Sequence, residues 1–413
     1  MLDITRYIRP GDTVMWSNGT AEPTSLTEML ISARESLRNT RIICIVPFST
    51  HFTSNVITYF HFSGIGGYGF LEALERERRL EILPIRYSDL PRFLREGALK
   101  VDVALVQVSP KAEDDCHTFG AAADYTRALV DSARCVVAEV NSQAPVTLGD
   151  TSVLPSSFTA YVEVSRPLLE YRSPEPDSVD LAVAENVARL IPDGATLEVG
   201  IGSLGEAVWR ALSRKHDLGV HSGILTDSVA DLMEAGVITN RRKTVDEGLT
   251  VGGVLFGTKR LYEFAHRNPR ISLRAIEYTH NPCIASRLER FFAVNFALKV
   301  DLTGQVNAEV ADGLHFGAVG GLPDFAEGAH RSHGGASIVA LRSTAKRGGV
   351  SRIVAHLDEG VVTLPRTNVD YVVTEFGIAE LRGKSLRERA RAMVNIAHPN
   401  FRGRLSKEAD AVA

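Results

Sequence analysis

The segment VDVALVQV, residues 101–108, decides the fold class of this chain. It is apolar almost throughout, whereas a strand with one face in water would alternate apolar and polar residues. Such a run is typical of a strand that helices cover on both faces, as in a parallel sheet. A second run, Val136-Val-Ala-Glu-Val140, follows a helical pattern over residues 121–133. Together they predict a strand, a helix and a second strand.

The same unit occurs near the N-terminus. Thr13-Val-Met-Trp16 is predicted to be a short strand, and residues 24–37 have the apolar spacing of a helix. Because strands and helices alternate along the chain, we predict an α/β fold with mostly parallel sheets.

Length and composition restrict the class of protein. The 413 residues exceed the usual size of one domain, so two or three are expected. With 46 basic and 50 acidic side chains the net charge is -4, which argues against a nucleic acid or an anionic membrane as the main partner. The four cysteines include no CxxC pair, so we expect neither a disulfide framework nor a metal site.

The chain opens without the pattern of a signal peptide. It also contains no apolar run near the roughly 20 residues that span a bilayer. We therefore expect a cytoplasmic enzyme that acts on small molecules.

One stretch has the character of a connection between domains. Tyr171-Arg-Ser-Pro-Glu-Pro-Asp-Ser178 carries two prolines and charge but no apolar periodicity. We place the boundary there, giving domains 1–175 and 176–413. Pro192-Asp-Gly194 and Pro10-Gly11-Asp12 each turn into a strand, which suggests tandem domains of related topology, although such turns are common in α/β proteins.

A glycine-rich loop follows the predicted strand 196–199. Gly200, Gly202 and Gly205 satisfy the pattern GxGxxG of dinucleotide sites. Such a site also needs an acidic residue at the end of the next strand, but the predicted strand 218–223 ends in glycine. The loop is therefore expected to offer backbone amides to a phosphate or an oxyanion.

A second glycine cluster contains the adjacent pair Gly320-Gly321. Consecutive glycines expose backbone N–H groups with no side chain in front of them, which suits an oxyanion or a thioester carbonyl. A tight loop without a ligand is the other interpretation, and a second glycine loop in the same domain favours a ligand pocket.

The sequence resembles the acetyl-CoA hydrolase/transferase family of CoA-transferases. The matching phrases in the C-terminal half are DGATLEVGIG (193–202), EAGVI (234–238), FGTKRLY (256–262), VDLTGQ (300–305), GGLPDF (320–325), SRI (351–353), YVVTEFG (371–377), LRGK (381–384) and IAHP (396–399). The N-terminal half adds residues 102–110, AEVN (138–141) and GD (149–150). The resemblance implies two tandem open α/β domains with the active site in the cleft between them.

The resemblance also implies a chemistry. In the family a glutamate carboxylate attacks an acyl-CoA thioester, and the resulting acyl anhydride gives a glutamyl-CoA thioester that a second acid resolves. The substrate is thus a CoA thioester, without a metal, and the partners are a small acyl-CoA and its acceptor. By this resemblance Gly320 and Gly321 supply the oxyanion amides, and we expect a homodimer.

Three positions depart from the family pattern. The family glutamate follows a His-Ser pair, and here His221-Ser222 is followed by Gly223, so no carboxylate stands at the catalytic position. Glu198 replaces a glutamine that is usual in the family, and His280 replaces an asparagine near the reacting carbonyl. The lost nucleophile, the gained acid and the gained imidazole indicate replacement chemistry.

The roles of these residues follow from their positions. Glu198 ends a strand beside a glycine loop, where burial would raise its pKa as a general base or substitute nucleophile requires, although a structural ion pair is equally compatible. An imidazole ordinarily titrates near neutral pH, so His280 is a candidate proton carrier, the alternative being a solvated turn histidine. Lys259 could meet a CoA phosphate, or lie on a solvated helix start.

Four hypotheses remain at this point. The first is acyl transfer from CoA without the family glutamate, with Glu198 and His280 activating water, an amine or a carbanion. The second is ordinary CoA transfer to a carboxylic acid with Glu198 as the nucleophile. The third is an acyl-CoA-binding protein without catalysis. The fourth is that Gly223 was introduced into an ordinary transferase, and the changes at positions 198 and 280 speak against it.

Overall fold

All six residues of β5 (Val103–Val108) are buried, as the apolar run predicts. The computed structural model describes residues 2–113, 115–358 and 360–412. In the N-terminal half β5 belongs to a seven-stranded sheet in the order β4-β3-β2-β1-β5-β7-β9, and every pairing in this sheet is parallel. The other six strands are β1 (Thr13–Trp16), β2 (Arg41–Ile43), β3 (His61–Gly64), β4 (Leu80–Ile82), β7 (Cys135–Asn141) and β9 (Ala160–Val164).

Both faces of this sheet are covered. Val103 and Leu105 belong to one apolar core, and their neighbours Ala104 and Val106 belong to another on the opposite face. This division follows from the alternating direction of side chains along a strand. The helices of this half are α1 (Thr24–Ser32), α2 (Ser54–Ile57), α3 (Leu71–Arg76), α4 (Leu90–Glu96) and α5 (Thr126–Ser132).

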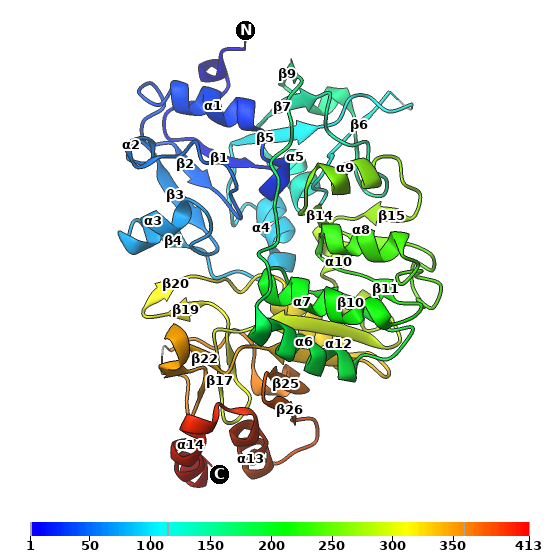
Figure 1. Ribbon diagram of the computed structural model, residues 1–413. Coiled ribbons are helices and arrows are strands. Elements are labelled where there is room, and N and C mark those ends of the chain that lie inside the picture. Colours follow the sequence, from blue (N-terminus) through cyan, green and yellow to red (C-terminus); the bar gives the residue numbers. More distant parts are fainter. Residues whose placement is uncertain (1, 114, 359, 413) are drawn as a thin grey trace.

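The C-terminal half contains a second sheet, in the order β11-β10-β16-β21-β25-β26, which is parallel except for the last pair. Its strands are β10 (Thr196–Val199), β11 (Gly219–Val220), β16 (Phe291–Phe296), β21 (Ala336–Ala340), β25 (Tyr371–Thr374) and β26 (Gly377–Glu380). The prediction of an α/β fold with mostly parallel sheets is confirmed. Residues 165–177, which join the two sheets, form neither helix nor strand (Figure 1). The division after residue 175 stays a prediction.

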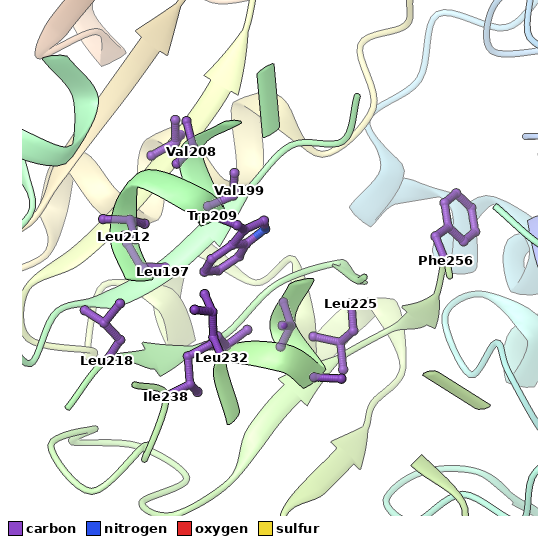
Figure 2. Packing of buried hydrophobic residues seen from close by; sticks show 14 of the residues in the cluster. Leu197, Val199, Val208, Trp209, Leu212, Leu218, Leu225, Leu232, Ile238 and Phe256 are labelled. Carbon is purple, nitrogen blue, oxygen red and sulfur yellow. The ribbon is translucent and has the colours of Figure 1, made fainter. Parts of the chain in front are cut away.

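Helices also flank this second sheet (Figure 1). The helices of this half are α6 (Ser178–Leu190), α7 (Ser203–Ala211), α8 (Asp227–Glu234), α9 (Lys259–Ala265), α10 (Ile276–Thr279), α11 (Pro282–Ala285), α12 (Leu322–Arg331), α13 (Leu386–Ile396) and α14 (Pro399–Val412), of which α6, α12 and α13 pack on the strands of the sheet. Figure 2 shows Trp209 of α7 packed among Leu197 and Val199 of β10 and Leu232 of α8. This core fixes the glycine loop between β10 and α7.

Five short strand pairs and one three-stranded sheet complete the fold within the described residues. They are formed by β6 (His117–Thr118) with β8 (Ser152–Val153), β12 (Ile224–Leu225) with β14 (Val254–Leu255), β13 (Thr250–Gly252) with β15 (Ile271–Leu273), β17 (Lys299–Asp301) with β18 (Val306–Asn307) and β24 (Ile353–Val354), β19 (Val310–Ala311) with β20 (Leu314–His315), and β22 (Thr344–Ala345) with β23 (Val350–Ser351).

The predicted helix over residues 121–133 is too long, because α5 begins only at Thr126. The preceding residues bond to the other half instead. Leu255 N donates to Ala121 O, and both Ala123 N and Asp124 N donate to Gly253 O. The amides and carbonyls that would form hydrogen bonds within a helix therefore form hydrogen bonds between the two halves instead.

Two other predicted elements are shorter than expected. The helix predicted over 24–37 ends at Ser32. The strand predicted over 218–223 covers only Gly219–Val220, because the chain then leaves β10 and Ser222 N donates to Val251 O. This turn carries Gly223 away from the sheet.

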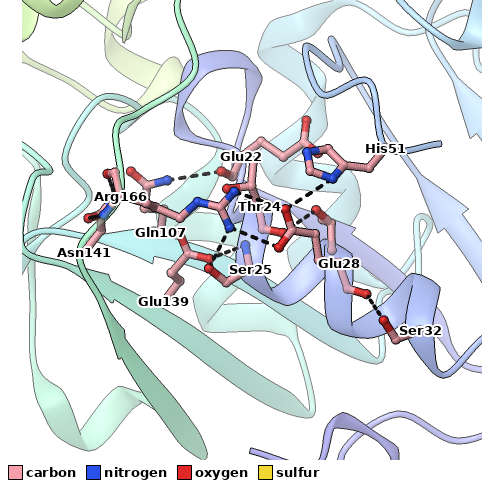
Figure 3. A network of polar contacts seen from close by, with 11 residues as sticks. Glu22, Thr24, Ser25, Glu28, Ser32, His51, Gln107, Glu139, Asn141 and Arg166 are labelled. Atoms are coloured by element: carbon pink, nitrogen blue, oxygen red, sulfur yellow. Dashed lines mark hydrogen bonds and ion pairs between the residues drawn. The ribbon is translucent and has the colours of Figure 1, made fainter.

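A partly buried polar network holds α1 on the first sheet (Figure 3). Glu139, at the end of β7, accepts from Ser25 N at 2.7 Å. Arg166, after β9, donates to the Ser25 hydroxyl at 2.9 Å and to Glu28 at 3.1 Å. Charged side chains of this kind are tolerated inside a protein because each one is hydrogen-bonded.

Candidate active site

A cavity of about 320 Å³ lies between the two halves. Glu198 and Asn295 reach it from the carboxyl ends of β10 and β16, and Asn18 reaches it from the end of β1. In the first sheet β1 has β2 on one side and β5 on the other, and in the second sheet β10 has β11 on one side and β16 on the other. The direction in which strands are added therefore reverses at β1 and at β10. Ligands of open α/β sheets bind outside the strands at such points.

Six residues singled out from the sequence line this one cavity: Glu198, Gly200, Gly223, His280, Gly320 and Gly321. Gly202 lines an adjoining groove instead. Lys259 lines neither space, and its ammonium lies 3.4 Å from Glu263 on an exposed face of α9. The fold thus places six of the predicted site residues, which are far apart in the chain, around one cavity, whereas Lys259 lies elsewhere on the surface.

The His280 ring lies between two glycines. A Cβ atom placed on Gly223 would be 2.6 Å from His280 Cε1 and 2.8 Å from Nε2. A Cβ atom on Gly321 would be 2.5 Å from Cδ2 of the same ring and 2.6 Å from Nε2. Real Cβ atoms essentially never approach so closely. The imidazole therefore occupies the space in which a side chain at position 223 would begin.

The surroundings of His280 keep its ring neutral. It is 5% exposed, and its ring centroid lies 4.5 Å from that of Phe325 and 5.2 Å from that of Tyr87. Burial is the main cause that lowers the pKa of His280 to about 3, and electrostatic repulsion from the nearby His221 is the second cause. The expectation that His280 titrates near neutral pH is therefore wrong, and its solvated alternative is wrong too. Nδ1 pairs with the Thr279 hydroxyl at 2.8 Å.

Glu198 is also buried, at 5% exposure, and no cation pairs with it within the described residues. Burial raises the pKa of Glu198 to about 8, as the sequence analysis expects of a buried carboxyl, while a hydrogen bond from Asn295 Nδ2 at 2.8 Å opposes the rise. At neutral pH the carboxyl is mostly protonated. It can then donate a hydrogen bond from the position where glutamine is usual in the resembling family.

The loop at Gly320 and Gly321 offers free amides. Tyr87 N donates to Gly320 O, and Phe325 N donates to Gly321 O, but in the described chain no protein acceptor takes the N–H of either glycine. Gly320 has φ of +54°, a conformation that favours glycine. The loop opens α12, whose N-terminal end favours negative charge. The arrangement can stabilise an oxyanion.

A second polar group at this cavity is not evident from the sequence. Asn18 Nδ2 donates to the Tyr87 hydroxyl at 2.7 Å and to Asp124 at 3.0 Å, and Tyr87 donates to Asp124 at 2.7 Å. Nor is Asn295 evident, since its only signal in the sequence is a polar residue near the end of the apolar run FFAVNF. Asp124 and Tyr87 are separated from their partners by many residues, so no spacing pattern could have found them.

The adjoining groove, of about 680 Å³, shares Ile201, Phe296 and Ala308 with the cavity. It runs past Gly202 and the first turn of α7. Arg352 lines it half-buried, and among the described residues no hydrogen bond or ion pair engages its guanidinium. The carboxylates of Glu375 and Asp180 in the same groove interact with it electrostatically but form no ion pair with it. A cation that is free to bond, beside a helix N-terminus, is suited to an anionic group.

The chain belongs to the acetyl-CoA hydrolase/transferase family. The family's N-terminal domain matches residues 2–167 and its C-terminal domain matches residues 257–409. The chain is 39% identical over 398 residues to the 4-hydroxybutyrate coenzyme A transferase of Clostridium kluyveri, covering 96% of this chain and 93% of that one. It is 34% identical to the butyryl-CoA:acetate CoA-transferase of Anaerostipes caccae, covering 99% and 94%.

A solved structure agrees with this assignment. RipA from Yersinia pestis matches with a TM-score of 0.92 and 31% identity, over 98% of this chain and 95% of that one. The chain is thus an acyl-CoA transferase or hydrolase-like enzyme. Among the described helices we find none that combines the length and the apolar character needed to cross a membrane. The cytoplasmic location and the homodimer stay predictions.

Proposed function

We propose that this enzyme transfers the acyl group of a CoA thioester to an acceptor without a covalent intermediate at position 223. The observation that carries the proposal is the His280 ring between Gly223 and Gly321. Glycine has no nucleophile, and the imidazole leaves no room for a side chain there. The acceptor therefore attacks the thioester carbon itself, the carbon–sulfur bond breaks, and CoA leaves as the thiolate.

The cavity residues have distinct roles in this proposal. The amides of Gly320 and Gly321 hold the thioester oxygen as it gains negative charge. The protonated Glu198 carboxyl donates a further hydrogen bond, and it can supply the proton that the leaving thiolate takes up. His280 stays neutral, and with the tautomer in which Nδ1 carries the proton, Nε2 can accept a hydrogen bond from a protic acceptor. The proton that such an acceptor loses restores the Glu198 carboxyl after the thiolate has been protonated.

The groove beside the cavity is where we place the CoA portion. It joins the cavity at Ile201 and Phe296, so a thioester can extend from one space into the other. The first turn of α7 after Gly202, and Arg352 with its guanidinium free of hydrogen bonds among the described residues, are suited to phosphate groups. The neighbouring Arg342 is bound to Asp180 at 2.7 Å, which leaves Arg352 as the better candidate.

A second candidate is CoA transfer between an acyl-CoA and a carboxylic acid with Glu198 as the nucleophile. The names of the two relatives, a 4-hydroxybutyrate and a butyryl-CoA:acetate CoA-transferase, support a carboxylic acid as the acceptor. Glu198 is the carboxylate among the cavity-lining residues, and only its minor ionised form at neutral pH could attack. The two candidates differ in whether the chain becomes covalently modified.

Incubation with acyl-CoA, followed by borohydride and intact-mass analysis, separates them. We expect CoA release in the presence of an acceptor and no modified glutamate, because no carboxylate stands at position 223. A reduced residue at Glu198 would establish the second candidate instead. Binding of acyl-CoA with no release of CoA, for any acid, amine or water, would indicate a binding protein and contradict both.

The pKa of Glu198 gives a pH prediction. If the protonated carboxyl is the working form, activity falls as the pH rises through about 8, because the proton is then lost. Glu198→Gln keeps a hydrogen-bond donor without a titrating proton, so we expect its pH–rate profile to lack that descending limb. The measurement is the turnover rate from pH 6 to pH 10. An unchanged limb in the variant would assign the titration to another group.

A further inference from the structure

The walls of the cavity are largely apolar. Apolar side chains come from the N-terminal half after β2 and β3, and from the C-terminal half around β12, β14, β16 and α12. They belong to Ile45, Val46, Ile65, Ile224, Val254, Phe256, Phe296, Leu322 and Phe325. Among all the described residues that line this cavity there is no lysine and no arginine.

A negatively charged group, Asp124, lies behind the cavity wall formed by Asn18 and Tyr87. Asp124 is 1% exposed, and its oxygens accept from neutral groups: the side chains of Asn18, Tyr87 and Thr126 and the backbone of Tyr125. Burial raises the pKa of Asp124 to about 6, so the group is mostly ionised at neutral pH. Arg86 does not line the cavity. Its guanidinium is half-exposed and lies 4.0 Å from Glu327.

We propose that this cavity selects thioesters whose acyl chain is uncharged and rejects those whose chain ends in a carboxylate. The inference rests on the proposed function, because it places the acyl chain in the cavity. A carboxylate at the far end of the chain would lose its water without gaining a cation, and it would lie near Asp124. An apolar chain gains from burial against these walls.

A pair of probes isolates the charge. Succinyl-CoA and its amide analogue succinamoyl-CoA have nearly the same size, and only the first carries a free carboxylate. We expect succinamoyl-CoA to bind at least about tenfold more tightly, and butyryl-CoA more tightly still, by titration calorimetry at pH 7.5. Equal binding of the pair, or tighter binding of succinyl-CoA, would overturn the inference.

A variant that adds a positive charge to the cavity wall tests the same preference for uncharged acyl chains. Val46→Lys places a cation on the cavity wall at a half-buried position, and we expect it to reduce the preference for succinamoyl-CoA about tenfold. Val362→Lys adds the same charge at a position that is 46% exposed and outside the cavity, so it should keep the preference. If the folded Val46→Lys protein keeps the full preference, the charge of the wall does not set it.

The outcomes for the two proposals differ. Selective binding of uncharged thioesters without any CoA release would contradict the proposed function and leave the acyl preference established. Rapid CoA release with succinyl-CoA as the favoured thioester would contradict only the preference. A protein that binds none of the three thioesters would overturn both.

Discussion

The double variant Gly223→Glu, His280→Asn is expected to form a glutamyl-CoA thioester that neither the parent protein nor Gly223→Glu alone can form. The reason is steric. A Cβ atom at position 223 would be 2.6 Å from the His280 ring, so a glutamate fits there only if a smaller side chain replaces the imidazole. Asparagine is smaller and matches the residue usual in the resembling family. The expected change is from no adduct to a fully modified chain, measured by intact mass after borohydride treatment.

The single variants are the controls for this experiment. Gly223→Glu alone should lose about 1–3 kcal/mol of unfolding free energy, because the cavity wall is overpacked, and the second change should restore most of it. His280→Asn alone should remain unmodified, since it adds no nucleophile at position 223. An adduct in Gly223→Glu alone would show that the imidazole does not obstruct the position. A folded, thioester-binding double variant without an adduct would show that space is not the deciding factor.

Replacement of Gly321 by valine is expected to lower turnover of acyl-CoA about 10²–10³-fold, as the loss of an oxyanion donor typically does. Its added Cβ atom would be 2.5 Å from His280 Cδ2 and would also lie beside the free amides of the loop. The fold should persist, because the φ of Gly321 is -90° and a valine can adopt it, although overpacking against the ring should cost about 1–3 kcal/mol of unfolding free energy. Circular dichroism and steady-state turnover measure the two effects.

Gly403→Val is the matched control for this substitution. Nothing lies within 4 Å of a Cβ atom at Gly403, which is exposed on α14, so turnover should stay within about twofold of the parent. Full activity in Gly321→Val would contradict the proposal that the amides of this loop bind the thioester oxygen. An equal loss in both variants would point to a general effect of adding valine.

The sequence alone determined the fold class, because a strand buried on both faces must be apolar at nearly every position, as residues 101–108 are. It also located Gly223, Glu198 and His280 by the phrases around them, and the three residues line one cavity. Their roles in the reaction stay a proposal. Local patterns were less successful at element ends. The helix predicted over 121–133 starts late because its first residues bond to Gly253 and Leu255, more than 100 residues away.

The tertiary structure alone decided the states of the site residues. A histidine in solution titrates near neutral pH, but burial between Gly223, Gly321 and Phe325 lowers the pKa of His280 to about 3. Likewise the pKa of Glu198 depends on the absence of water and on Asn295, which lies on another strand. The free energy of a charge depends on the dielectric and the partners around it, and only the folded chain brings those partners together.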